Sequence, residues 1–131
     1  MSRLAVRVVI AVLAAVFAVA AAASEVLEPK TSNHGGVSVT VAPRNVSGNV
    51  WEFEVVMDTH TEPLNDDLAR SAVLVIPEGE LPASWSGDGP GGHHRKGLLT
   101  FKAPASPPAM ITIRLARPGE AQARSFQWER K

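Results

Sequence analysis

The chain contains no cysteine among its 131 residues, and this absence excludes several kinds of chemistry. A small exported domain often relies on disulfides, so this one must depend on side-chain packing or on a bound ion for its stability. Cysteine is also excluded as a metal ligand and as a catalytic nucleophile.

The local motifs of common enzyme sites are absent as well. There is no Gly-x-Ser-x-Gly elbow, no phosphate-binding loop, no dinucleotide-binding glycine pattern and no His-Glu-x-x-His pair. The residue types of a hydrolase triad are present, but nothing in their spacing indicates a triad geometry. These residues are Asp58, His60, Ser84 and Ser86. We therefore expect a protein that is not an enzyme.

The apolar run at the start of the chain is too short for a membrane span. It covers the sixteen residues from Val8 to Ala23, whereas a spanning helix needs about 20. Arg3 and Arg7 flank its start, and Ala21-Ala22-Ala23 offers the small residues that signal cleavage requires. Residues 1–23 therefore predict a cleaved signal peptide and a periplasmic or secreted protein without a stable membrane span. An uncleaved membrane anchor is the alternative.

The sequence has no excess of charge of either sign. Its 13 basic and 13 acidic residues cancel, and removal of Arg3 and Arg7 with the signal peptide leaves a formal charge of −2. Binding to nucleic acid through its phosphates requires an excess of basic residues, so we expect no nucleic-acid partner. The remaining chain from Ser24 to Lys131 is long enough for one domain and too short for two.

Alternation of apolar and polar residues is the main pattern after the signal peptide. It is clearest from Trp51 to Met57, where every second residue is apolar, as in a strand with one face on a core. Further strands are expected near 37–41, 71–76, 99–102, 111–115 and 126–128. Six to seven short strands separated by proline and glycine predict an all-β fold, a single antiparallel β-sandwich of immunoglobulin or fibronectin type over residues 37–131. Residues 24–36 are polar and are expected to form a flexible lead-in.

The polar stretch from Thr61 to Asp67 interrupts this pattern. Asp66 and Asp67 are adjacent, so their side chains would point apart in an extended chain and would not form a catalytic carboxylate pair. We expect both of them in a solvated turn.

Residues that could bind a ligand are most concentrated between Trp85 and Lys96, in the sequence Trp-Ser-Gly-Asp-Gly-Pro-Gly-Gly-His-His-Arg-Lys. Strand parity places His94 on the solvent face of the following strand and His93 on the inward face together with Arg95. The adjacent imidazoles should therefore diverge, unless the preceding glycine pair distorts the backbone.

A second histidine-bearing segment could complete a metal site with this one. Asp58 and His60 follow the strand that begins at Trp51, and parity places both on its solvent face. Imidazole nitrogens with a carboxylate suit copper(II) or zinc(II), whereas calcium requires more oxygen ligands. The sequence thus predicts a divalent metal site that draws on Asp58, His60, His93 and His94, with Asp88 and His34 as further candidates.

Two other interpretations of the glycine-rich segment stay open. It can be a structured turn in which Asp88 caps backbone amides, or an anion-binding nest at the basic edge from His93 to Lys96. We expect an exported domain that acts by binding, with a divalent metal ion as the leading ligand. The alternative function is an interaction module of the cell envelope, whose His-His-Arg loop contacts a partner protein without metal.

These motifs resemble those of a group of short, exported, uncharacterised prokaryotic β-sandwich proteins. The group pairs an Asp-Thr-His strand end, here Asp58 to His60, with a Trp-x-Gly-Asp-x-Pro-Gly-Gly-His-His-Arg segment, here Trp85 to Arg95. The likeness extends from about Val50 to Trp128 and implies no activity for any residue. Small exported copper carriers are also similar at the level of the fold, but the methionine-rich ligand pattern of a copper(I) site is absent.

Overall fold

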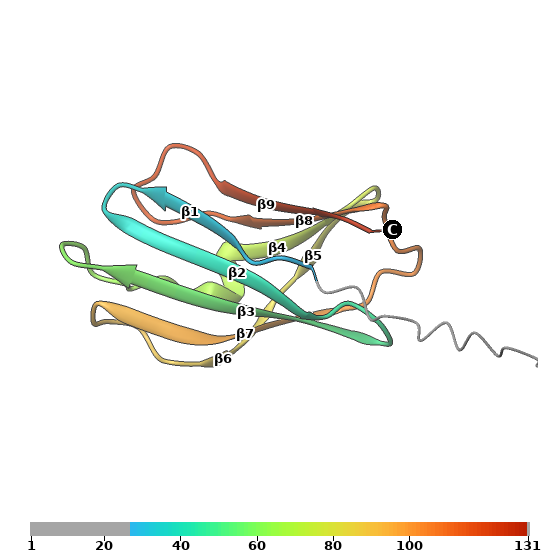
Figure 1. The fold of residues 1–131 in the computed structure, drawn as a ribbon, viewed down its shortest axis with the longest axis horizontal. Coiled ribbons are helices and arrows are strands. Elements are labelled where there is room, and N and C mark those ends of the chain that lie inside the picture. Colours follow the sequence, from blue (N-terminus) through green and yellow to red (C-terminus); the bar gives the residue numbers. More distant parts are fainter. Residues whose placement is uncertain (1–26, 131) are drawn as a thin grey trace, which may run out of the picture.

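The fold is a sandwich of two β-sheets (Figure 1), and the computed structural model describes residues 27–130. The predicted signal peptide, residues 1–23, lies outside this range. In chain order the elements are β1 (Lys30–His34), β2 (Val37–Asn45), β3 (Val50–Thr59), α1 (Leu68–Ser71), β4 (Ala72–Ile76), β5 (Gly79–Pro82), β6 (Ser84–Gly87), β7 (His94–Lys102), β8 (Met110–Leu115) and β9 (Arg124–Glu129).

Both sheets are antiparallel throughout. One has five strands in the order β1-β2-β3-β7-β6, and the other has four in the order β5-β4-β8-β9. The predicted antiparallel β-sandwich is therefore confirmed, with nine strands in the described chain instead of six to seven. Among residues 27–130, no helix combines the length and hydropathy that a membrane crossing requires.

The core lies between the sheets and follows the alternation in the sequence. Along β3 every second side chain, from Trp51 to Met57, is buried. Phe53 has no exposed surface, and its ring meets Phe101 edge-on at a centroid distance of 5.7 Å and Trp128 of the opposite sheet at 5.8 Å. Burial of large apolar side chains from both sheets is the main favourable contribution to such a fold.

Three strands were not predicted, and each of them lies at the edge of a sheet. These are β1, β5 and β6. The flexible lead-in expected for residues 24–36 is wrong at Lys30–His34, because this segment pairs with β2 along its whole length. An edge strand is held by backbone hydrogen bonds on one side and needs no buried side chains, so it has no alternating apolar pattern. The sandwich therefore begins at Lys30 and not at Val37.

Candidate functional site

All four histidines of the chain lie at one end of the five-stranded sheet. His34 ends β1, His60 directly follows β3, His93 directly precedes β7, and His94 is the first residue of β7. Antiparallel pairing places the ends of β1 and β3 beside the starts of β2 and β7, so segments far apart in the sequence meet here. We call this region the histidine end, defined by these four residues.

A hollow of about 770 Å³ lies at the histidine end, beside the turn between β1 and β2. Its lining includes His34, Asp58, His60 and His93. Three of the four residues predicted as metal ligands therefore face one space, and the fourth, His94, contacts Asp58 directly.

Asp58 and His94 form a side-chain hydrogen bond across two neighbouring strands. They are register partners of β3 and β7, and 2.5 Å separate the imidazole Nδ1 of His94 from the Oδ1 of Asp58. Both side chains are more than half exposed, at 57% for Asp58 and 58% for His94. A carboxylate at Nδ1 favours the form that carries its proton there, which leaves Nε2 free to accept a proton or to bind a metal ion. The pair therefore fixes which nitrogen of His94 is available.

Strand parity predicted the position of His94 correctly and that of His93 wrongly, because His93 is exposed and precedes the strand instead of facing inward with Arg95. His94 is exposed on the solvent face of β7, whereas Arg95, the next residue, is only 2% exposed. His93 lies outside the strand and lines the hollow, and its carbonyl accepts a hydrogen bond from the Thr59 amide at 3.0 Å.

The four predicted ligands do not yet form a closed coordination shell. Within residues 27–130, no three histidine, aspartate or glutamate side chains are placed closely enough to hold one ion together. Asp88, a further candidate, accepts a hydrogen bond from the Lys96 amide at 3.0 Å, as the turn interpretation predicts. Asp58, His60 and His93 share the hollow, and His94 joins them only through its contact with Asp58.

The serines with triad potential lie away from the Asp58–His94 pair. Ser84 and Ser86 are the register partners of Thr100 and Leu98, well along β7 from its first residue. The residue types of a hydrolase triad are thus spread along the sheet and do not converge on one point.

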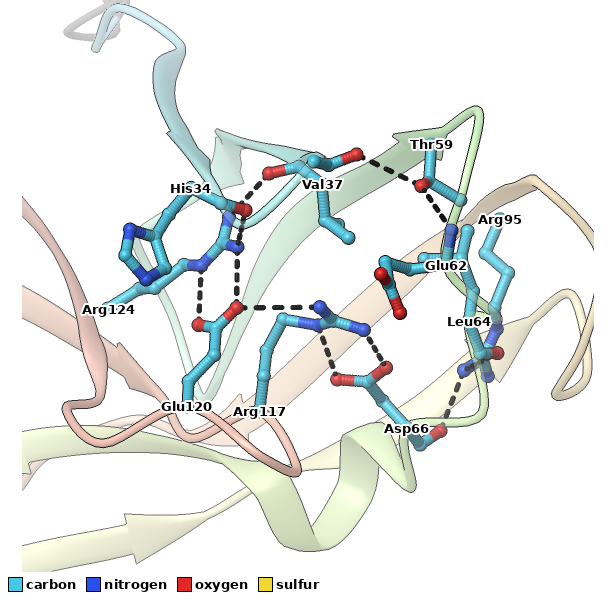
Figure 2. A network of polar contacts seen from close by, with 11 residues as sticks. His34, Val37, Thr59, Glu62, Leu64, Asp66, Arg95, Arg117, Glu120 and Arg124 are labelled. Carbon is cyan, nitrogen blue, oxygen red and sulfur yellow. Dashed lines mark hydrogen bonds and ion pairs between the residues drawn. The ribbon is translucent and has the colours of Figure 1, made fainter.

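Buried polar groups hold each histidine-bearing segment in place (Figure 2). The hydroxyl of Thr59 donates to the carbonyl of Gly36 at 2.9 Å and accepts hydrogen bonds from the amides of Thr61 and Glu62. This buried threonine therefore ties the turn after β3, which carries His60, to the turn between β1 and β2.

Arg124 fixes the segment that carries His34. Its guanidinium, only 4% exposed, donates to the carbonyls of Ser32, His34 and Val37 at 2.9 to 3.0 Å. The carboxylate of Glu120 accepts two further bonds from it, at 2.8 and 2.9 Å. The β1–β2 hairpin of one sheet is thus joined to β9 of the other.

A second ion pair, between Asp66 and Arg117, continues this network. Asp66 accepts hydrogen bonds from Nε and Nη2 of Arg117 at 3.0 and 2.9 Å, and Glu120 lies 3.5 Å from Nη1 of the same arginine. The prediction of a solvated turn is wrong for Asp66, whose side chain has 0% exposure, and correct for Asp67, which is 63% exposed. The arginine that pairs with Asp66 lies 51 positions along the chain, so no local pattern could have indicated its burial.

Glu120 makes the stability of this network dependent on pH. The hydrogen bonds from Arg124 lower the pKa of its carboxyl group, burial opposes this, and the positive charges of Arg124 and Arg117 lower it further. Because the folded-state pKa is depressed, the stabilisation is fully present above the ordinary glutamate value of about 4.3 and is lost as the pH falls through the lower folded value.

We therefore expect Glu120→Gln to reduce the free energy of unfolding at about pH 7 and to have much less effect at about pH 3. Urea unfolding of both proteins at the two pH values measures this difference. The exposed Glu62→Gln exchange is the matched control and should behave like the wild type at both. Parallel stability curves for Glu120→Gln and the wild type across this range would contradict the assignment.

Comparison with known proteins supports the fold and does not indicate a function. No family model and no curated protein matches the chain. The crystal structure of a DUF4426 family protein from Pseudomonas aeruginosa PAO1 is similar, with a TM-score of 0.50 and 18% sequence identity. The match covers 78% of this chain and 94% of that one. At this level of identity the likeness supports a common β-sandwich and does not carry a function from one protein to the other.

Proposed function

We propose that this protein is an exported, non-enzymatic domain that binds a divalent metal ion, copper(II) or zinc(II), at the histidine end. The observation that carries the proposal is the gathering of every histidine of the chain at one end of the sheet, where Asp58 and three of the four histidines line one hollow. Neutral imidazole is a common ligand of both ions.

In this proposal Asp58 and His94 have separate roles. Asp58 holds Nδ1 of His94 and thereby orients the ring, and Nε2 of His94 binds the ion. His60 and His93 supply the other nitrogen ligands from the hollow. His60, His93 and His94 are exposed, so their side chains can change rotamer when the ion binds.

The proposal predicts that the purified protein takes up copper(II) or zinc(II) and that His94→Ala and His60→Ala each weaken this uptake. Loss of a direct ligand should cost more than the roughly 10-fold to 100-fold in affinity that loss of an orienting partner costs, and Asp58→Asn should fall within that lower range. Isothermal titration with each ion measures the affinities, and elemental analysis measures the metal content after purification.

Asp67→Asn is the matched control, because this aspartate is exposed and lies outside the histidine end. Thermal melts provide a second readout, since an ion bound only by the folded state raises the melting temperature and a chelator reverses the effect. Equal uptake by the wild type and both histidine variants would contradict the proposal. It would leave the interaction module as the alternative function, tested by crosslinking with and without alanines from His93 to Lys96.

A further inference from the structure

Arg95 is a buried, charged residue that has no role in the proposed metal site. We propose that it is the positioning residue of the histidine end. Its guanidinium fixes the backbone that leads into β7 and so places His93 and His94 relative to Asp58. The consequence for metal affinity rests on the function proposed above, whereas the placement of the histidines can be tested without metal.

The contacts of Arg95 join two loops that are distant in sequence. Its Nη1 donates to the carbonyls of Asp66 at 2.6 Å and Leu64 at 3.4 Å. Its Nε and Nη2 both donate to the carbonyl of Asp88, at 3.3 and 3.0 Å. The amide of Gly91 also donates to the Leu64 carbonyl, at 2.8 Å. The loop before β7 is thus held against the loop before α1 at two points.

The partners of this buried cation are unusual. All hydrogen bonds of the Arg95 guanidinium within residues 27–130 go to backbone carbonyls, and the Asp66 carboxylate bonds to Arg117 instead. The face of Trp85 lies 5.6 Å from the Arg95 Cζ and adds a cation–π contact. Burying a charge without an opposite charge is costly, and an apolar side chain of similar size often gives equal or greater stability. The placement of the loop backbone is what this guanidinium provides and an apolar side chain cannot.

The glycine-rich motif gives Arg95 its partners. The indole Nε1 of Trp85 donates to the same Asp88 carbonyl at 3.0 Å, so three donors from two side chains converge on one oxygen. A Cβ at Gly97 would lie 2.6 Å from the Trp85 ring and 2.5 Å from the Ser86 carbonyl, so only glycine permits this close approach. The segment from Trp85 to Gly97 is therefore a folded clamp around Arg95.

His93 and His94 lie within this clamp, so its fold determines where the two histidines are placed. His93 and His94 follow the anchored Asp88 and Gly91 and immediately precede Arg95. A metal site tolerates errors of only about 0.5 Å in ligand position, so a loose loop lowers affinity even when every ligand is present. The expected cost is that of an orienting partner, about 10-fold to 100-fold in affinity.

Arg95→Lys tests the inference, because lysine keeps the charge but cannot extend a planar fork to three carbonyl groups. Arg117→Lys is the matched control. It is also buried, at 8% exposure, and belongs to the same network, but its side-chain hydrogen bonds go to Asp66 and Glu120 and to no residue of the clamp. Trp85→Phe is a milder second variant that keeps an aromatic side chain and removes the indole N–H that donates to the Asp88 carbonyl.

We expect Arg95→Lys to weaken copper(II) binding by about 10-fold to 100-fold and to change the electron paramagnetic resonance spectrum of the bound ion. Arg117→Lys should lower the melting temperature without changing the copper(II) affinity or the spectrum of the bound ion. Circular dichroism establishes that each variant is folded at the temperature of the titration. A folded Arg95→Lys protein with wild-type affinity and spectrum would overturn the inference.

A metal-free readout separates this inference from the proposed function. The ¹⁵N shifts of the His94 imidazole report its tautomer and its contact with Asp58. Arg95→Lys and Trp85→Phe should shift them, and Arg117→Lys should not. If the wild type binds neither copper(II) nor zinc(II), the proposed function fails, and these shifts decide the inference alone. Unchanged His94 shifts in Arg95→Lys would then reject it.

Discussion

Replacement of Asp66 by alanine is expected to lower the free energy of unfolding by about 3–5 kcal/mol, the typical cost of removing one partner of a buried ion pair. Asp66 has no exposed side-chain surface and Arg117 is 8% exposed, so water replaces few of the hydrogen bonds that the guanidinium loses. Glu120, at 3.5 Å, is the other carboxylate near Arg117, and Arg124 already engages it at 2.8 Å. The substitution therefore leaves a buried positive charge with weak compensation.

Urea unfolding at neutral pH measures this loss, and the adjacent Asp67→Ala variant is its control. Asp67 is 63% exposed and lies 3.6 Å from an exposed Arg70, so its removal should change stability by about 0.5 kcal/mol or less. The double exchange Asp66→Ala with Arg117→Met should restore part of the loss, because it removes the unpaired charge as well. A similar small effect for both aspartates would contradict the burial of Asp66.

The second large effect is expected at the centre of the core. Phe53→Ala should lower the free energy of unfolding by about 3–5 kcal/mol, the range found when a large buried aromatic is truncated. The Phe53 ring contacts Phe101 in its own sheet and Trp128 in the opposite one. Its loss opens a cavity between two sheets whose paired backbones cannot easily close it.

Val50→Ala on the same strand is the matched control for this prediction. Val50 is 49% exposed, so its truncation should cost about 0.5 kcal/mol or less. Chemical unfolding monitored by tryptophan fluorescence measures both variants. Comparable losses for Phe53→Ala and Val50→Ala would show that Phe53 does not join the two sheets.

The sequence predicted the strands that carry core residues and missed those that do not. β3 and β8 were predicted because each alternates between a buried and a solvent face. β1, β5 and β6 have almost no buried side chains and exist through pairing with a neighbour. Pairing through the backbone does not require particular side chains, so the local sequence pattern could not predict these three strands.

The same limit applies to the histidine end. Parity alone predicted that His94 would face solvent and that Arg95 would face inward, and both predictions are confirmed. The contact of His94 with Asp58 depends on the register between β3 and β7, which the sequence suggests but does not determine. The metal ion itself stays a prediction.

Sequence analysis missed the burial of Arg117 and Arg124, although a signal was available for Arg124. Arg124 shares the parity of Phe126 and Trp128 along β9, so it points to the core side of its sheet. A charged residue in an apolar alternation is a reason to look for a buried pair. Its partner Glu120 is only four residues away, but its three carbonyl partners lie about 90 residues earlier in the chain.

The register of β3 against β7 also determines where this chain can change length. Residues added near Gly89 would lengthen a loop and leave Asp58 opposite His94. One residue inserted between Gly97 and Leu99 would leave the C-terminal half of β7 in place and turn its N-terminal half over, with His94 toward the interior and Arg95 toward water. Natural homologues that keep the Asp58–His94 pair should therefore be constant in length within β7.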